Sequence, residues 1–305
     1  MRVTLLGPQR RPTLDAVVAG LVPAGTIATV TAGWQEREPD DGELSTLLGG
    51  RDVNLQLYRR WLDVQERDPS FAAAERRLAE VLAELQESYL LRLDYALQAV
   101  YALQRRGGND PLQAAVLAEA VEAARELDAA HLRRTGHVRG EFYQAMQPHD
   151  RPAIAGHRAE VATVLGEASC LAIAGGHVGV LTDLLHLFNI AAAAKSQIIA
   201  WSAGAMALTE RIVLFHDRSA HGPGHPEVYG TGLSAVRNVV ALPHARARLL
   251  LDDWPRMAIF ARRFAPARCV LLEAGTYLDI NGDGSLPRSA QVLDAGGRVT
   301  TWEAA

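Results

Sequence analysis

The stretch IIAWSAGAMAL, residues 198–208, places Ser202 between a run of β-forming residues and a helical sequence. A strand, a serine and a helix in this order are what a nucleophile elbow requires. The turn lifts the hydroxyl out of the sheet at the carboxyl ends of the strands, and the following helix directs its N-terminus toward developing negative charge. Small residues also follow buried strands for packing alone. Ser202 is therefore either a catalytic nucleophile or a small residue in a buried turn.

A second group of side chains has the types that bind metals. The loop HDRSAHGPGHPEVYG carries three histidines and a carboxylate that could act as ligands: His216, Asp217, His221 and His225. The same loop is rich in glycine and proline, and scattered surface histidines are the commoner case. We expect no metal there.

Two further motifs are incomplete. Asp279, Asn281, Asp283 and Gly284 imitate the first half of an EF-hand loop, but Ala290 stands where that loop needs a glutamate, so the stretch is expected to form a β-turn. The glycines at 175, 176 and 179 do not make the dinucleotide fingerprint. We expect no cofactor.

Short apolar runs alternating with amphipathic stretches predict the framework that holds Ser202. Strands are expected at 2–6, 26–31, 53–58, 170–175, 196–202 and 270–280, with a closing hairpin over 291–304. Helices are expected at 13–21, 40–48, 157–168, 180–194 and 203–212. Buried strands that alternate with helices favour an α/β fold with a mainly parallel sheet covered by helices on both faces.

A long helical segment interrupts this alternation. From Phe71 to Arg106 the apolar residues recur at steps of three and four without an internal glycine or proline. Glycines then end this helix, and Asp110 and Pro111 begin a second one, expected over 112–134, with a shorter helical piece at 140–146. We interpret 63–149 as an inserted helical hairpin, and 1–62 with 150–305 as the α/β domain. His131 and Arg133 on the second helix are expected to be solvated.

Composition limits the classes of function. The 305 residues are 49% hydrophobic and 22% charged with a formal net charge of −4, which gives no reason to expect nucleic acid or an anionic membrane as a partner. Cys170 and Cys269 lie in apolar runs, as free core cysteines do, which favours a reduced, cytoplasmic protein. No apolar run reaches the ~18 residues that span a bilayer, and the first residues lack a signal-peptide pattern.

Three stretches resemble one family of enzymes. IAGGHVGVLTDLL (173–185), AWSAGAMAL (200–208) and GLSAVRNVVALPHARARL (232–249) are similar to the strand-GGN-helix, elbow and histidine segments of the peptidase E and cyanophycinase serine hydrolases. The resemblance implies the flavodoxin-like fold of class I glutamine amidotransferases. At the elbow, Ala200 stands where that family has glycine, and His177 stands where it has asparagine. The helical insertion has no counterpart in the family.

The resemblance also implies roles for individual residues. Ser202 would be the nucleophile, His244 the base, and Asp217 the acid that orients the histidine. The backbone N–H groups of Gly176 and Ala203 would form the oxyanion hole. His177, Arg237 and Arg246 would contact substrate, with Arg248 a further candidate cation for a substrate carboxylate. Glu273 could orient a site residue, although a carboxylate that accepts from backbone donors at a strand end is the simpler interpretation.

Two functions remain open from the sequence. The first is a serine hydrolase that cleaves an amide bond of a small peptide through an acyl-enzyme, and the resemblance adds aspartyl peptides as candidate substrates. The second is a non-catalytic scaffold or binding protein that acts through the helical insertion. A glutamine amidotransferase fits less well, because that chemistry uses a cysteine at the elbow. The apolar stripe of the insertion favours a homodimer, since a long hairpin buries only part of its apolar surface alone.

Overall fold

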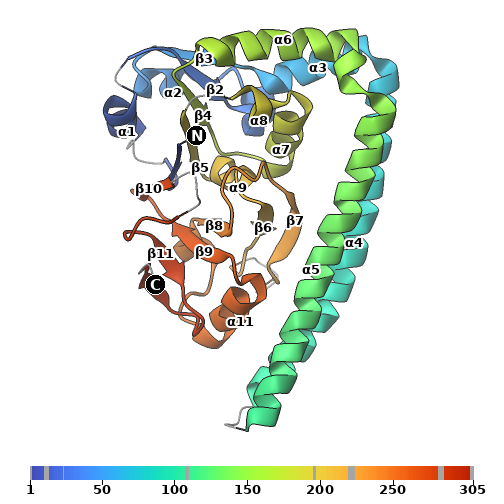
Figure 1. The fold of residues 1–305 in the computed structure, drawn as a ribbon, viewed down its shortest axis with the longest axis vertical. Coiled ribbons are helices and arrows are strands. Elements are labelled where there is room, and N and C mark those ends of the chain that lie inside the picture. Colours follow the sequence, from blue (N-terminus) through green and yellow to red (C-terminus); the bar gives the residue numbers. More distant parts are fainter. Residues whose placement is uncertain are drawn as a thin grey trace.

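A six-stranded sheet forms the centre of the protein (Figure 1). The computed structural model describes residues 2–9, 14–22, 24–106, 110–194, 197–218, 224–280 and 285–302. The strand order is β10-β1-β5-β4-β2-β3, with every pair parallel except the antiparallel edge pair β1 and β10. The strands are β1 (Val3–Leu6), β2 (Ile27–Val30), β3 (Asp52–Asn54), β4 (Cys170–Ile173), β5 (Gln197–Trp201) and β10 (Tyr277–Ile280). The mainly parallel α/β class expected from the sequence is confirmed.

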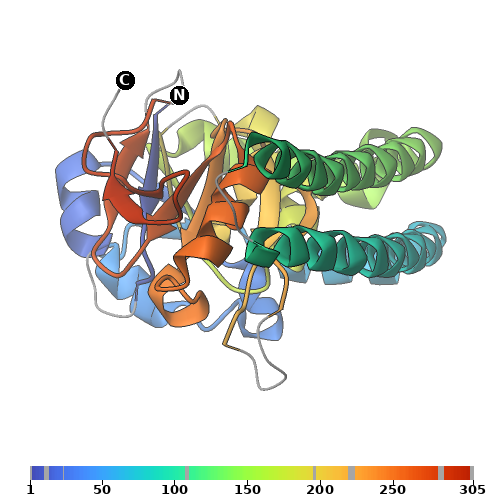
Figure 2. The ribbon, with the colours of Figure 1, turned by 90° about the horizontal axis from the view of Figure 1, so that it is seen from below.

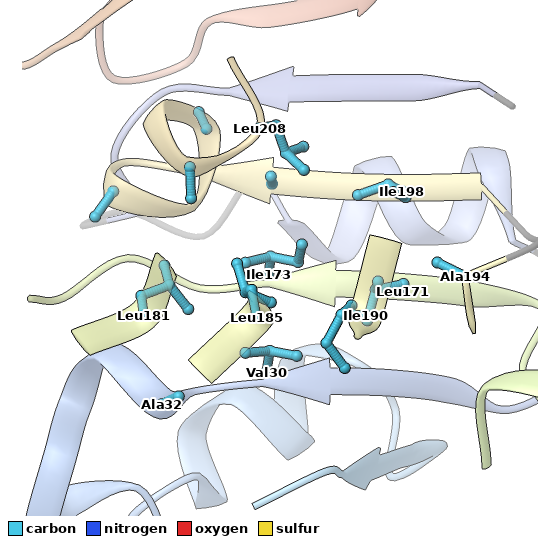
Figure 3. Close-up of a cluster of buried hydrophobic side chains, with 14 of the residues drawn as sticks. Val30, Ala32, Leu171, Ile173, Leu181, Leu185, Ile190, Ala194, Ile198 and Leu208 are labelled. Carbon is cyan, nitrogen blue, oxygen red and sulfur yellow. The ribbon is translucent and has the colours of Figure 1, made fainter. Parts of the chain in front are cut away.

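Alternating side chains send one apolar set to each face of this sheet. In β4, Leu171 and Ile173 point to one face, and Cys170 and Ala172 to the other, as the period of two requires. Helices α1 (Leu14–Leu21) and α2 (Gly42–Leu47) pack on the second face. The first face is covered by α3 (Leu57–Arg67), α6 (Pro152–Glu167), α7 (Val178–Leu187), α8 (Ile190–Ala193) and α9 (Ala203–Ala207). Figure 3 shows Leu185 and Ile190 of these helices meeting the sheet.

A second sheet of four strands lies beside the first, in the order β12-β11-β9-β8. Its strands are β8 (Val239–Pro243), β9 (Arg268–Leu272), β11 (Gln291–Leu293) and β12 (Val299–Thr301), and β8 runs parallel to β9. A separate hairpin joins β6 (Arg211–Leu214) to β7 (Glu227–Thr231). Two helices, α10 (Ala245–Arg248) and α11 (Trp254–Phe264), follow β8 in the chain.

The inserted hairpin consists of α4 (Pro69–Arg106) and α5 (Pro111–Met146), which run side by side along the body and reach past α11 (Figures 1 and 2). At 1.5 Å per residue, the 38 residues of α4 extend about 57 Å. The stripe formed by Tyr89, Leu93, Leu97 and Val100 is buried against α5, α11 and the second sheet. Asp110 caps α5 by accepting a hydrogen bond from the Leu112 N–H at 3.0 Å.

A buried polar cluster fastens this hairpin to the body. Arg263 of α11 donates to both oxygens of Asp128 of α5, at 2.6 and 2.8 Å, and to the hydroxyl of Tyr89 of α4 at 3.1 Å. That hydroxyl donates to Asp128 and accepts from the Val228 N–H of β7. His131 stacks on Tyr89 with ring centroids 4.2 Å apart and is 2% exposed. The expectation that His131 is solvated was therefore wrong, whereas Arg133 is exposed.

Several expected elements differ from those observed. The strand expected over 53–58 ends at Asn54, because Asn54 Oδ1 accepts the Gln56 N–H in a tight turn and α3 begins at Leu57. The expected strand 270–280 is two strands, β9 and β10, which belong to different sheets and are separated by a turn at Gly275 (φ 83°). The helix expected over 112–134 continues to Met146 and absorbs the short piece at 140–146.

Two other helices are shorter than expected. Asn189, at φ 55°, separates α7 from α8 within the stretch 180–194. The helix after Ser202 ends at Ala207, because residues from Arg211 form β6. Two further expectations fall partly on residues outside the described ones: Asn281, Asp283 and Gly284 of the expected β-turn, and His221 of the histidine-rich loop. No helix within the described ranges is long and apolar enough to cross a membrane.

Candidate active site

Ser202 occupies a strained turn between β5 and α9. Its backbone has φ 53° and ψ −123°, a conformation that a residue with a side chain adopts only when its surroundings impose it. One such constraint is the close packing of Gly204, two residues further on: a Cβ atom there would lie 2.4 Å from the carbonyl oxygen of Ile173. Such strain is concentrated at functional sites.

The hydroxyl-bearing turn lines a pocket of about 390 Å³, called here the serine pocket. Its walls come from the segments that follow β1, β2, β4, β5 and β8, where α/β proteins place ligands. The lining residues are Pro8, Gln9, Trp34, Gly175, Gly176, Val178, Trp201, Ser202, Ala203, Met206, Leu214, Pro243, His244 and Arg248. His244 and Arg248 are the titratable side chains among them. The pocket therefore combines a hydroxyl, an imidazole and a cation in a mainly apolar surround.

His244 comes directly after β8 and has a left-handed backbone (φ 58°, ψ 34°). Its N–H donates to the Leu272 carbonyl oxygen of β9 at 3.2 Å, and Pro243 pairs with Leu272 in the parallel register. The positive φ ends the strand and starts α10 at once, which holds the imidazole at the edge of the serine pocket. Ser202 and His244, expected as nucleophile and base, thus line the same pocket although they come from different sheets.

The expected oxyanion hole lies in the same pocket. Gly176 has φ 118°, and a Cβ atom there would lie 2.3 Å from the Gly33 carbonyl oxygen, so only glycine fits. The carbonyl of Gly33 accepts the His177 N–H at 2.7 Å, which fixes the loop that carries Gly176. Among the described residues, none accepts a hydrogen bond from the N–H of Gly176 or Ala203. Both groups are therefore available to a ligand oxygen.

Asp217, expected as the catalytic acid, is fully buried and already engaged. Its Oδ1 accepts from Arg256 at 2.7 Å, and its Oδ2 accepts from the Leu250 N–H at 3.1 Å. Burial lowers the pKa of Arg256 and the hydrogen bond to Asp217 raises it, with a net upward shift. Asp217 does not line the serine pocket. Its contacts connect the chain after α10 to α11.

Glu273 follows the strand that pairs with the strand ahead of His244. It follows Leu272 directly, and Leu272 is the register partner of Pro243, so Glu273 and His244 extend from neighbouring ends of β9 and β8. The Oε1 atom of Glu273 accepts the Arg246 N–H at 2.7 Å, which ties the carboxylate to the first turn after the histidine. The sequence-based interpretation of Glu273 as a strand-end carboxylate that accepts from a backbone donor is confirmed.

The residues expected to contact substrate are placed differently from one another. His177 is exposed, and its Nδ1 accepts the Val180 N–H at 3.2 Å as the N-cap of α7. Arg237 precedes β8, so the five residues of that strand, about 16 Å, separate it from the end that carries His244. Arg246 is exposed and contributes its backbone N–H to Glu273. The structure brings none of these three side chains into the serine pocket, but it does bring Arg248 there.

Sequence reasoning missed several lining residues, among them Gln9, Trp34 and Trp201. The signal that could have found them is position, because each is the last residue of a strand or follows one closely at the carboxyl edge of the parallel sheet. Trp34 is held by the turn after β2, in which Glu38 accepts the N–H groups of Tyr58 and Arg59. Burial raises the pKa of Glu38 despite these donors.

The histidine-rich loop does not assemble ligands in the part of the chain that the structure describes. No group of three or more His, Cys, Asp or Glu residues there could hold a metal ion. His225 lies 3.3 Å from Asp94 of α4 and stacks on Tyr101 with ring centroids 5.7 Å apart. This histidine therefore contacts the inserted hairpin.

The fold and the site together define an α/β protein with a serine at a strained strand-to-helix turn. No protein-family model matches the chain, and no curated protein matches it. Among solved structures, it is similar to the crystal structure of a peptidase from an acI-B1 Actinobacterium, with 13% sequence identity and a TM-score of 0.42. That match covers 95% of this chain and 86% of the other.

Proposed function

We propose that the protein is a serine hydrolase that cleaves an amide bond of a small acidic peptide through an acyl-enzyme on Ser202. The observation that carries the proposal is the strained backbone of Ser202 in a pocket that it shares with His244. A strained serine with an imidazole on the same pocket wall matches the requirements of an activated nucleophile.

The chemistry assigns one task to each group. His244 accepts the hydroxyl proton as Ser202 Oγ attacks the carbonyl carbon, and then donates that proton to the leaving amine. The N–H groups of Gly176 and Ala203 donate to the oxygen that becomes negative. A water molecule then attacks the ester, and its proton passes to His244 before returning to Ser202. The products are an amine and a carboxylate.

Glu273 is better placed than Asp217 to be the acid that orients His244. Glu273 follows the strand that pairs with the histidine-bearing strand, and its one described side-chain bond, from the Arg246 N–H, ends on Oε1. Asp217 has a donor on each oxygen, and its nearest cation is Arg256. We therefore propose Glu273 as the acid and a structural role for Asp217.

The charge of the pocket supports an acidic substrate. Among the described residues that line the pocket, Arg248 is the permanent cation and none is a carboxylate. A guanidinium binds a carboxylate with two parallel hydrogen bonds, which makes an aspartyl or glutamyl side chain, or a terminal carboxylate, the preferred group.

The test is hydrolysis of a matched set of dipeptide anilides with an aspartyl, asparaginyl or lysyl residue before the scissile bond. The proposal predicts that the aspartyl compound is cleaved fastest, that Arg248→Gln removes this preference, and that Ser202→Ala removes all cleavage. Full turnover by Ser202→Ala would overturn the nucleophile assignment. An unchanged aspartyl preference in Arg248→Gln would overturn the substrate assignment alone.

A set of exposed apolar residues on the hairpin favours the second candidate, a protein-binding role. Leu91, Tyr95 and Leu112 are 62%, 66% and 69% exposed, so most of each large apolar side chain contacts water in the single chain. We propose that this surface pairs two copies of the chain. Sedimentation velocity of the wild type and of Tyr95→Glu tests it: the proposal predicts a dimer that the variant loses, and a monomeric wild type would refute it.

A further inference from the structure

A second pocket lies where the hairpin meets the body and is called here the junction pocket. Its volume is about 260 Å³, which suits a small organic molecule. It lies between α3, the N-terminal part of α4, the C-terminal part of α5, the turn after β2 and α7. The lining residues are Gln35, Tyr58, Trp61, Gln65, Glu75, Arg76, Leu78, Ala79, Leu82, Arg139, Phe142, Tyr143, Val180, Asp183 and Leu184.

The walls of the junction pocket are mainly aromatic and aliphatic. Tyr58 and Trp61 contact each other with ring centroids 5.3 Å apart, and Phe142 and Tyr143 do so at 5.4 Å. Burial raises the pKa of Tyr143 to about 12, so this ring stays neutral near physiological pH. Four rings around one cavity offer negative π faces to any positive group that enters.

One carboxylate in this pocket has no cation. Glu75 accepts from Trp61 Nε1 at 2.8 Å and from Gln65 Nε2 at 2.7 Å, and both bonds end on Oε2. Within the described ranges, no other group donates to Glu75 and no basic residue pairs with it, which leaves Oε1 without a protein donor. Of the two arginines among the lining residues, Arg139 is paired with Asp183 at 2.7 Å and Arg76 is exposed.

The electrostatic surroundings of Glu75 favour a positive ligand. Burial raises the pKa of Glu75. The negative charge of Asp183 raises it further, because a negative charge nearby disfavours ionisation of the Glu75 carboxyl group. A cation beside Oε1 would relieve both effects. The strained turn at Gln35 (φ 57°, ψ −125°) forms part of the same wall, and such strain is concentrated where ligands are held.

We infer that the junction pocket binds an organic cation, a primary ammonium group carried on an aromatic or branched apolar body. The ammonium donates to Glu75 Oε1 and faces the aromatic rings, while the apolar body contacts Leu78, Leu82 and Leu184. This site is independent of the proposed hydrolase activity, because the serine pocket shares no lining residue with it.

Calorimetric titration with three probes that share a phenylethyl group tests the inference: 2-phenylethylammonium, neutral 2-phenylethanol and anionic 3-phenylpropanoate. The pH is set at about 8, which favours the ionised form of a carboxyl group whose pKa is raised. The expected result is saturable binding of the ammonium probe in the millimolar range or tighter, weaker binding of the alcohol, and none of the carboxylate.

Three variants locate the site. Glu75→Gln keeps the shape of the side chain and removes its charge, so the ammonium probe should bind about tenfold more weakly or worse while the alcohol is unaffected. Glu80→Gln, an exposed position on the same helix, should change nothing. Ala79→Phe adds a ring at an exposed helix position that lines the pocket and should block both probes, which keeps the test valid if Glu75→Gln fails to fold.

Three results would overturn the inference. The first is no saturable binding of the ammonium probe by the wild type. The second is equal binding of the ammonium and alcohol probes, which would mean that charge plays no part. The third is unchanged ammonium binding in both Glu75→Gln and Ala79→Phe, which would place the probe elsewhere on the protein.

Discussion

Gly175 and Ser202 are packed so closely that a Cβ atom added to Gly175 would lie 2.8 Å from Ser202 Cβ. Contacts this short do not occur between real Cβ atoms. Residue 175 therefore has to be glycine if the turn at Ser202 is to keep its observed conformation. The segment after β4 and the turn after β5 therefore depend on each other. This contact links the expected oxyanion loop to the expected nucleophile.

Gly175→Ala should displace Ser202 and so reduce its reactivity while the fold survives. The added methyl group is expected to cost about 1–3 kcal/mol of unfolding free energy, as overpacking does. The matched control is Gly156→Ala in α6, where a Cβ atom meets nothing within 4 Å. That change should stabilise the helix by about 0.5–1 kcal/mol. Urea denaturation and active-site labelling measure the two effects, and a fully reactive Gly175→Ala would contradict the geometry described.

Glu273→Gln and Asp217→Asn should separate the two candidate acids. If Glu273 orients His244, Glu273→Gln lowers the turnover rate by about 10²–10⁴-fold with little change in stability. Asp217→Asn weakens a buried ion pair with Arg256 and should destabilise the fold by a few kcal/mol, on the order of 2–4. Thermal denaturation and the rate at saturating substrate are read together for each variant. A rate lost in Asp217→Asn but kept in Glu273→Gln, with both proteins folded, would return the acid role to Asp217.

Arg263→Met should weaken the attachment of the hairpin. It leaves the carboxylate of Asp128 buried without its cation, which is expected to cost about 3–5 kcal/mol. The control is Arg133→Met, because Arg133 lies 3.9 Å from Glu126 at the surface and should change stability by less than about 0.5 kcal/mol. Urea denaturation measures both. Equal stabilities would mean that the buried cluster does not hold the hairpin.

His131→Phe should make the protein less sensitive to acid. Burial lowers the pKa of His131 below 6.5, and the charge of Arg134 lowers it further. The charge of Asp128 and a hydrogen bond with the backbone of Tyr229 raise this pKa, but by less. The unfolded chain therefore binds the proton more readily, and stability falls as the pH drops below about 6.5. Phenylalanine keeps the stacking on Tyr89 and removes the buried Nε2, which has no partner among the described groups. The stability of the variant relative to the wild type should rise between about pH 7.5 and 5.5; a constant difference would argue against the titration.

The periodic spacing of apolar residues predicted the strands and helices of the α/β domain well, because burying one face of an element imposes that spacing. The parallel strands β1, β2, β4 and β5 are short apolar runs with one set of side chains on each face, and α4 carries its stripe without interruption. The expectation of one strand over 270–280 was wrong because the local sequence does not record that the segments on either side of Gly275 pair in different sheets. The glycine at 275, between Glu273 and Tyr277, marks a turn in the sequence but does not indicate that the chain passes to another sheet.

The site was predicted in part for a similar reason. Ser202 was found because strand, serine and helix form a local pattern, and local patterns survive in a linear sequence. The neighbours of His244 depend on the pairing of β8 with β9, which no local pattern records. Charge alone therefore could not rank Arg248, which lines the serine pocket, above Arg237 and Arg246, which do not.

The central claim is that Ser202 is an activated nucleophile, and labelling with a fluorophosphonate probe tests it most directly. The modified residue is read by mass spectrometry in the wild type, in Ser202→Ala and in His244→Ala. We predict a single adduct on Ser202 that is absent from Ser202→Ala and strongly slowed in His244→Ala. A folded wild type that takes up no probe, or an adduct on Ser202 that forms equally fast without His244, would contradict the claim.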